Sequence, residues 1–257
     1  NLNPETLAVL FRHLVRSHRG LGSLSFSPMD PTADGSQRLF RALGLAGLVS
    51  FKFFCFANWF LRAPASWDDY LASRSVAQRE VIGRAVAKLS VAGARVEIIT
   101  LPADVERGMA AYERVFDASA KRGQPFPEFI NGLARGSAER GELRLGVVWL
   151  EDRPVAVQLW LAAQGMASVY KLAHDESCRD LAPDNGLFAA LLRHVIEQDG
   201  VREVDCLIGN DICKSTWMEQ SRQRWGVVAF NPMSPAGLAG ALAHQVMPPK
   251  AASRRRF

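Results

Sequence analysis

Three stretches decide the fold: LRLGVVWL at 143–150, VAVQLWLA at 155–162 and ASVYKLA at 167–173. They are rich in β-branched and aromatic residues, which favour β-strands. The segment EDRP connects the first two, and Gln164-Gly165 lies between the second and third, so both connections are short enough for tight turns. We therefore expect an antiparallel meander of three strands over residues 143–173.

The meander is followed by a helical pattern and a further strand. After a loop at 175–184, one helical face has apolar residues at Leu187, Phe188, Leu191, Leu192, Val195 and Ile196. A strand at 203–208 would follow this helix, which can serve as the crossover that parallel pairing with the third meander strand requires. A short helix at 211–220 and a strand at 226–230 complete this part. The sequence thus predicts an α/β fold with a mixed sheet.

The segment before the meander shows a partial repeat of the same order. A helix from Pro4, a strand at 21–26, a helix at 37–43 and a strand at 48–56 repeat the helix–strand–helix–strand order after the meander. We infer an incomplete first unit, lacking its front half, packed on a complete second unit. Between them we expect a helix at 68–90, a strand at 95–100, and helices at 102–120 and 127–135. The predicted divisions are 1–65, 66–232 and a basic, mobile tail at 233–257.

Composition narrows the protein class. The chain has 31 Lys and Arg against 26 Asp and Glu, a mildly basic balance of +5 that suits an anionic ligand or surface. Four cysteines are too few for a disulfide scaffold, and we expect reduced thiols in a cytoplasmic protein. The sequence has no HExxH, CxxC, GxSxG, Walker or GxGxxG motif, so we expect no metal cofactor.

An apolar run at 43–61 has nearly the length that crosses a bilayer. It contains Lys52 and Asn58, and its centre, FKFFCF at 51–56, is aromatic-rich. These features favour a buried strand over a membrane helix.

Several segments, in one order, resemble the CelD-like branch of the GNAT superfamily of N-acyltransferases, which is related to the FemAB aminoacyl transferases. The matching segments are VAVQLW at 155–160, VYKLAHD at 169–175, LAP at 181–183, VDCLIGND at 204–211 and KSTW at 214–217. The resemblance covers about 67–232, and residues 1–61 are similar to the degenerate first unit of the same tandem arrangement. It implies a GNAT-like fold and acyl transfer from a thioester to an amine.

The sequence departs from this family at the donor site. The usual Pro-Gly step at the helix start is Pro183-Asp184-Asn185-Gly186 here, Cys213 stands where a tyrosine is usual, and the pyrophosphate loop is absent. Acyl-CoA and an acyl-carrier-protein thioester therefore both stay open as co-substrates, as does an aminoacyl donor.

The resemblance places three candidate catalytic residues. His174 and Asp175 end the third meander strand, where His174 could accept the proton of the amine and Asp175 could orient a base. Both also suit an ordinary surface turn. Asp205 falls in a strand expected to be buried, where a carboxylate is costly unless it is paired, so we expect it to have a functional or network role.

The resemblance also implies binding residues. The third strand and the helix after it would hold the donor, through Tyr170, Lys171, Leu172, Asn185 and Gly186. The acceptor cleft would be lined by Asp211, Lys214 and Trp217. The alternatives are a solvated strand lysine for Lys171, a surface pair for Asp211 and Lys214, and a core position for Trp217.

We expect the acceptor to be an amine of an envelope precursor, either an amino sugar or a long-chain amine lipid. A FemAB-like aminoacyl transferase and a non-catalytic module in exopolysaccharide assembly are the alternatives. We expect no nucleic-acid partner. The basic helix containing Arg74, Arg79, Arg84 and Lys88, together with the basic tail, suggests contact with the anionic inner face of the membrane; a solvated helix face is the alternative.

Overall fold

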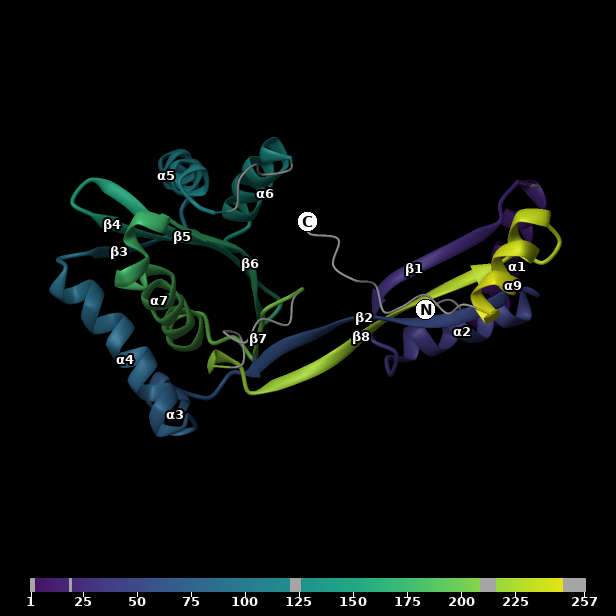
Figure 1. Cartoon of the computed structure of the whole chain (residues 1–257), viewed down its shortest axis with the longest axis horizontal. Coiled ribbons are helices and arrows are strands. Elements are labelled where there is room, and N and C mark those ends of the chain that lie inside the picture. Colours follow the sequence, from purple (N-terminus) through teal and green to yellow (C-terminus); the bar gives the residue numbers. More distant parts are fainter. Residues whose placement is uncertain (1–2, 19, 121–125, 209–215, 247–257) are drawn as a thin grey trace. The chain divides into compact units, whose positions relative to one another are not determined.

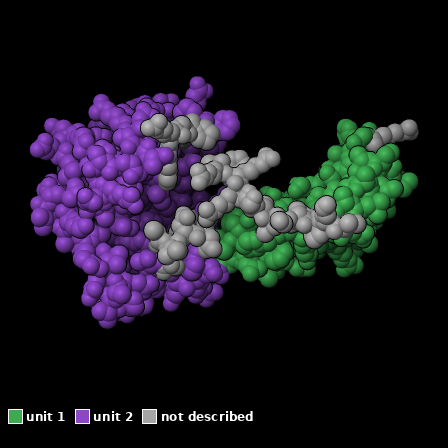
Figure 2. All heavy atoms as spheres, in the orientation of Figure 1, with its two compact units in different colours: residues 1–58, 222–257 green, residues 59–221 purple. Residues whose placement is uncertain are grey.

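The computed structural model describes residues 3–18, 20–120, 126–208 and 216–246 (Figure 1). Its strands form one eight-stranded sheet in the order β1-β8-β2-β7-β6-β5-β4-β3. The chain divides into two compact units, residues 1–58 with 222–257 and residues 59–221 (Figure 2). We call them unit 1 and unit 2.

The strands of unit 2 confirm the predicted meander. Strands β4 (Leu143–Leu150), β5 (Arg153–Ala163) and β6 (Met166–His174) pair antiparallel in sequence order, and β3 (Arg95–Ile99) pairs antiparallel with β4. Strand β7 (Glu203–Asp205) runs parallel to β6, also as predicted. The fold is therefore a mixed α/β sheet, mostly antiparallel with a single parallel pair among the described strands.

Helices cover both faces of this sheet (Figure 1). On one face lie α5 (Val105–Asp117) and α6 (Pro127–Glu139), which follow the 3₁₀ turn η1 (Pro102–Asp104). On the other lie α4 (Val76–Val91) and α7 (Pro183–Glu197), with the short α3 (Trp67–Ala72) and the 3₁₀ turn η2 (Glu176–Leu181).

Each face of the sheet has its own hydrophobic cluster. The α5/α6 cluster includes Tyr112, Phe116, Ile130, Leu145 and Leu159. The α4/α7 cluster includes Leu89, Val148, Trp160, Leu187 and Phe188. Side chains from β4 and β5 alternate between the two clusters because successive residues of a strand point to opposite faces.

The helix predicted at 68–90 is in fact two helices. Helix α3 ends at Ala72, and Ser75 starts α4 with a capping box: its side chain accepts from the amide of Gln78, whose side chain accepts from the amide of Ser75. These reciprocal bonds satisfy amides at the helix start and favour a new helix there. Arg74 lies in the connection, only 5% exposed, and is not part of an exposed basic face.

Unit 1 contains α1 (Pro4–Ser17), β1 (Ser23–Met29), α2 (Asp34–Leu45) and α9 (Pro235–Val246). Strands β2 (Val49–Arg62) and β8 (Gln220–Phe230) each contribute residues to both units. Asn3 caps α1 by accepting from the amide of Thr6, as the Asn-Pro start predicts. Leu43, Leu48, Val227 and Ala229 are the buried members of its hydrophobic cluster.

Two boundaries in this part were predicted wrongly. Residues 235–246 form α9 instead of belonging to a mobile tail. The helix packs on the strands of unit 1, where the ring of His244 stacks on that of Phe51 with ring centres 4.5 Å apart. Strand β8 begins at Gln220, where a helix was expected. The rest of the helix predicted at 211–220 lies mostly outside the described residues, as do residues 247–257.

The apolar run at 43–61 enters strand β2, as predicted, but most residues at its centre, 51–56, are partly buried and not fully buried. None of the helices in the described ranges has the length and the apolar composition of a membrane-spanning segment.

Candidate functional site

Strands β6 and β7 are paired only briefly. Their parallel pairing joins Met166–Ser168 to Glu203–Asp205, where β7 ends, and β6 continues to His174. On its other edge β6 pairs with β5 along its whole length, with one irregularity: Trp160 faces Val169 and Leu159 faces Lys171. Tyr170 is therefore the extra residue of a β-bulge, a feature that turns side chains and backbone groups locally.

The bulge distributes the predicted donor-binding residues over both faces of the sheet. Tyr170 packs against the α5/α6 cluster. Lys171 lies opposite Leu159 of that cluster, so its side chain leaves the same face, and its Nζ lies 5.9 Å from the ring centre of Tyr170. Leu172 packs against the α4/α7 cluster. The three residues share one strand but not one surface.

His174 lies between two carboxylates at the end of β6. Its Nδ1 is 3.8 Å from Oδ2 of Asp184, in the first turn of α7, and its Nε2 is 3.7 Å from Oε1 of Glu176. The ring is partly exposed. Both ring nitrogens therefore face carboxylate oxygens.

Asp175 holds the turn after β6. Its Oδ1 accepts from the amide of Ser177 at 2.9 Å, and its Oδ2 lies 3.2 Å from the Nη1 of Arg153. Burial by itself raises the pKa of this carboxyl, but hydrogen bonds from Ser177 and the charges of Arg153 and His174 bring the pKa below its ordinary value. Asp175 is therefore ionised and firmly bonded, and it positions the turn that follows His174.

Asp205 is 5% exposed at the end of β7. Its Oδ1 accepts from the amide of Leu207 at 2.6 Å, so the carboxylate is part of a hydrogen-bond network, as expected for a buried acid. Asp205 lies opposite Ser168, six positions before His174 on β6. At the rise of an extended strand this is about 20 Å, so the structure does not bring Asp205 and His174 together.

Backbone amides at the start of α7 already donate hydrogen bonds within the protein. The amides of Asn185 and Gly186 both donate to the carbonyl of Ala182, at 3.1 and 3.2 Å. Asp184 adds a negative charge to this turn, and a Cβ on Gly186 would lie 2.3 Å from Leu89 of α4. This turn does not fit a diphosphate, and its geometry does not support the predicted role of Asn185 and Gly186 in holding donor phosphates.

The predicted acceptor residues are described only in part. Asp211 and Lys214 lie outside the described residues. Trp217 is buried against Phe188, with ring centres 4.8 Å apart, and its carbonyl accepts from the hydroxyl of Tyr70. Trp217 is thus a core residue here, and its role in substrate binding stays a prediction.

Gln158 is a residue that the sequence reasoning missed. It is 1% exposed in β5, its Nε2 donates to the carbonyl of Asp184 at 2.7 Å, and its Oε1 accepts from the indole of Trp160 at 3.0 Å. Gln158 therefore fixes the start of α7 against the sheet. A single amide inside the apolar run VAVQLWLA was the available signal.

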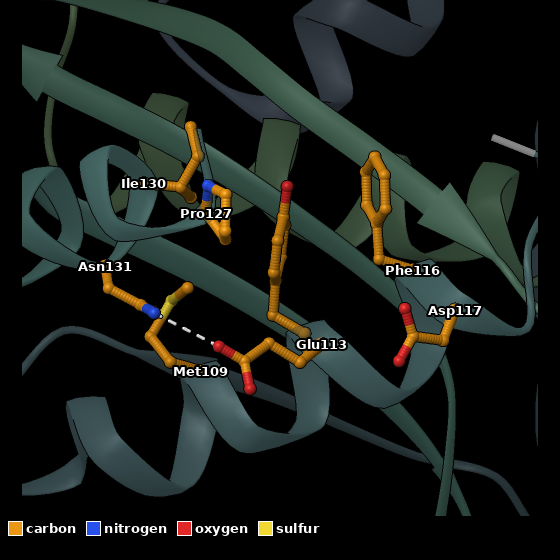
Figure 3. Close-up of a pocket in the computed structure, with 8 residues that line it drawn as sticks. Met109, Glu113, Phe116, Asp117, Pro127, Ile130 and Asn131 are labelled. Atoms are coloured by element: carbon orange, nitrogen blue, oxygen red, sulfur yellow. Dashed lines mark hydrogen bonds between the residues drawn. The ribbon is translucent and has the colours of Figure 1, made fainter. Parts of the chain in front are cut away.

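A pocket of about 250 Å³ between α5 and α6 was also missed (Figure 3). Buried side chains of Met109, Phe116 and Ile130 line it together with two carboxylates, Glu113 and Asp117. Glu113 accepts from Asn131 of α6 at 3.1 Å. The residues lie on two helices and are separated in the sequence, so only folding brings them together.

Metal ligands do not gather in the part of the chain that the structure describes: no group of three or more His, Cys, Asp or Glu side chains there could hold an ion.

Known proteins resemble this arrangement. The chain aligns over 97% of its length with 80% of the C-terminal domain of a putative lysylphosphatidylglycerol synthetase from Agrobacterium fabrum, at 13% identity and a TM-score of 0.60. Two further structures share the fold. L-PGS from Bacillus licheniformis aligns with 95% of this chain and 79% of its own, at 10% identity and a TM-score of 0.57. FemX aligns with 87% of this chain and 77% of its own, at 11% identity and a TM-score of 0.59.

No curated protein sequence matches the chain. The model of the acetyltransferase (GNAT) domain matches residues 77–215, which include β3, both covering helix layers, the meander and β7. Since this match extends over more than half of the 257 residues, the chain belongs to the GNAT acetyltransferase domain family.

Proposed function

We propose that the protein transfers an acyl group from an activated thioester to an amine. The observation that supports this most is the early end of the β6–β7 pairing beside the bulge at Tyr170, in a chain of the GNAT family. Beyond Ser168, the residues of β6 up to His174 extend past the last pair with β7. A thioester lying along this edge could receive hydrogen bonds from the strand, and a donor near the bulge would polarise its carbonyl.

His174 is the base that we propose for this reaction. The amine loses a proton to the ring, its nitrogen attacks the carbonyl carbon, and the carbon–sulfur bond breaks. The released thiolate then takes up a proton, from His174 or from water. Glu176 and Asp184 lie within 4 Å of the ring and can balance its charge in the protonated state.

The CelD-like resemblance extends this proposal to an envelope acceptor, an amino sugar or a long-chain amine lipid, reached from the inner face of the membrane. The unfavourable charge of Asp184 at the start of α7 is a reason to test an acyl-carrier-protein thioester beside acyl-CoA. Sedimentation with anionic vesicles at low and high salt tests the membrane contact, which salt should weaken.

Thiol release from acyl-CoA and acyl-carrier-protein donors, with a panel of amines, tests the activity. We expect His174→Gln to lower kcat about 100-fold, because general bases contribute roughly 10²–10⁴-fold, and to leave the melting temperature nearly unchanged. Asp205→Asn is the comparison variant, since the side-chain oxygen of the introduced asparagine can still accept the hydrogen bond from the amide of Leu207. Normal kcat in His174→Gln would remove His174 from the mechanism, and absence of thiol release with every donor–amine pair would overturn the proposal.

Aminoacyl transfer is the second candidate, because the fold is shared with FemX, with L-PGS and with the C-terminal domain of a putative lysylphosphatidylglycerol synthetase. Transfer that requires aminoacyl-tRNA, with no thiol release from acyl thioesters, would favour it over the first. Either reaction would also exclude a non-catalytic role in exopolysaccharide assembly.

A further inference from the structure

Gln158 links the sheet to the turn that contains Asp184. Its side chain is buried in β5, where its Nε2 donates to the backbone carbonyl of Asp184 at 2.7 Å and its Oε1 accepts from the indole of Trp160 at 3.0 Å. A carbonyl oxygen only accepts and an indole N–H only donates, so these two partners fix the orientation of the amide. In a buried setting such a fully bonded amide holds its partners in one arrangement.

The first turn of α7 begins without a capping side chain at the residue before it. That residue is Ala182, whose methyl group cannot accept a hydrogen bond and whose backbone is left-handed, with φ of 48°. Pro183, at the first helical position, has no amide hydrogen to donate. The hydrogen bond from Gln158 therefore supplies a side-chain anchor at a helix start that lacks the usual cap.

The same turn brings the carboxylate of Asp184 to His174. Oδ2 of Asp184 lies 3.8 Å from Nδ1 of His174. Across the β5–β6 pair, Gln158 faces Leu172 and Ala156 faces His174, so Gln158 and His174 are diagonal neighbours on the face of the sheet that α4 and α7 cover. One buried amide thus fixes the backbone of the residue whose carboxylate lies beside the imidazole ring.

We propose that Gln158 is a positioning residue for His174. Gln158 holds the backbone of Asp184, and the carboxylate of Asp184 orients the ring that accepts the proton of the amine. This rests on the N-acyl transfer proposed above. A displacement of about 1 Å at a reacting group can lower a rate about 100-fold, so loss of this anchor should slow the reaction in a protein that is still folded.

Two single variants and their combination separate positioning from stability. Gln158→Met keeps the approximate shape of the side chain and removes both hydrogen bonds, whereas Trp160→Phe removes the indole donor and leaves the bond to Asp184. Each should lower the melting temperature by about 3 °C or more, because each leaves a buried polar group unpaired. In the double variant neither the indole nor the amide is present, so its loss should be smaller than the sum of the two single losses.

Thiol release measures the reaction in the same variants. We expect Trp160→Phe to keep kcat within about twofold, and Gln158→Met and the double variant each to lose about tenfold or more, with a much smaller change in KM. In an Asp184→Asn background, Gln158→Met should lower kcat little further, because it acts through Asp184. Wild-type kcat in the double variant, or an equal loss of kcat in Trp160→Phe, would overturn the proposal.

NMR tests the positioning without turnover. The chain has five histidines, and the ring signals of His174 can be assigned by their loss in His174→Gln. Gln158→Met and Asp184→Asn should both shift these signals, and Trp160→Phe should leave them nearly unchanged.

The two measurements distinguish failure of this proposal from failure of the proposed function. If the His174 signals shift as expected but the wild-type protein consumes no thioester with any amine, the proposed function fails and Gln158 still positions His174. If amines drive thiol release while Gln158→Met keeps its kcat and its His174 signals, Gln158 has a structural role only and the proposed function stands.

Discussion

The two units differ in how they bury their apolar residues. In unit 2, β4 and β5 lie between two hydrophobic clusters, one on each face of the sheet. In unit 1 the described residues form one smaller cluster, with four buried members. Helices α1 and α9 leave Val9, Leu10, Leu238 and Leu242 half exposed. We infer that most of the stability lies in unit 2, where the candidate site is, because apolar burial is the main favourable term in folding.

Two helical glycines, one in each unit, differ in how closely they are packed. In α7 of unit 2, Gly186 touches α4 so closely that a Cβ would meet Leu89 at 2.3 Å and the carbonyl of Ala85 at 3.3 Å. In α2 of unit 1, Gly44 has open space around it. The contrast belongs to these two positions, because Gly237 in α9 of unit 1 is also closely packed, with a Cβ that would lie 2.1 Å from the carbonyl oxygen of Asn231.

The largest expected effect is that of Trp160→Ala in unit 2. Trp160 is fully buried, contacts Phe188 and donates to Gln158, so its loss should cost about 3–5 kcal/mol and loosen the start of α7. Leu43→Ala in unit 1 should cost about 2–3 kcal/mol, because a small cluster can relax around the cavity.

Hydrogen exchange read by mass spectrometry distinguishes the two effects. Leu43→Ala should raise exchange in α1, α2 and β1 and leave β4–β6 protected. Equal loss of protection in β4–β6 would mean that the units do not differ as we infer.

A smaller effect of opposite sign is expected for Gly→Ala in the two units. Gly44→Ala should stabilise unit 1 by up to about 1 kcal/mol, since alanine is the better helix former. Gly186→Ala should destabilise unit 2 by about 1–3 kcal/mol through overpacking against Leu89. Urea unfolding measures both changes.

Gly83→Ala is the matched control, because Gly83 lies in α4 with open space around it and should behave like Gly44. Combining Gly186→Ala with Leu89→Ala should cost less than the sum of the two single changes. Stabilisation by Gly186→Ala alone would show that the α4–α7 contact is looser than its geometry indicates.

The smallest effect concerns acid. Hydrogen bonds from Arg107, together with Arg95 and Trp149, hold the pKa of Glu97 in β3 at about 2. This is below the ordinary value of a glutamate, so the bonds stabilise unit 2 above about pH 4.3 and their contribution is lost as the pH falls toward 2.

Glu97→Gln should therefore cost about 1–2 kcal/mol at pH 7 and much less near pH 2, as measured by urea unfolding at several pH values. Glu106→Gln is the control, since Glu106 is a fully exposed ion-pair partner on α5 and should matter much less. An equal cost of Glu97→Gln at pH 7 and pH 2 would contradict the pKa shift.

Local patterns determined a large part of this fold. The meander, its turns, the capped start of α1 and the parallel β7 all follow from alternation, turn residues and the crossover helix, which depend on neighbours in the sequence. Strand β7 proved shorter than predicted because the side chain of Asp205 bonds the amide of Leu207, and Leu207 has a left-handed backbone with φ of 51°. A side chain that accepts a hydrogen bond from a nearby backbone amide can end a strand even though the apolar pattern of the sequence continues.

The sequence by itself determined the order of strands and helices and the position of His174 and Asp175 at the end of β6, because these depend on short-range periodicity. Tertiary structure decided the rest. It placed His174 between Glu176 and Asp184, separated it from Asp205 by about 20 Å, and brought Glu113 of α5 to Asn131 of α6. These arrangements depend on a one-residue bulge and on how two helices pack, which no local pattern specifies.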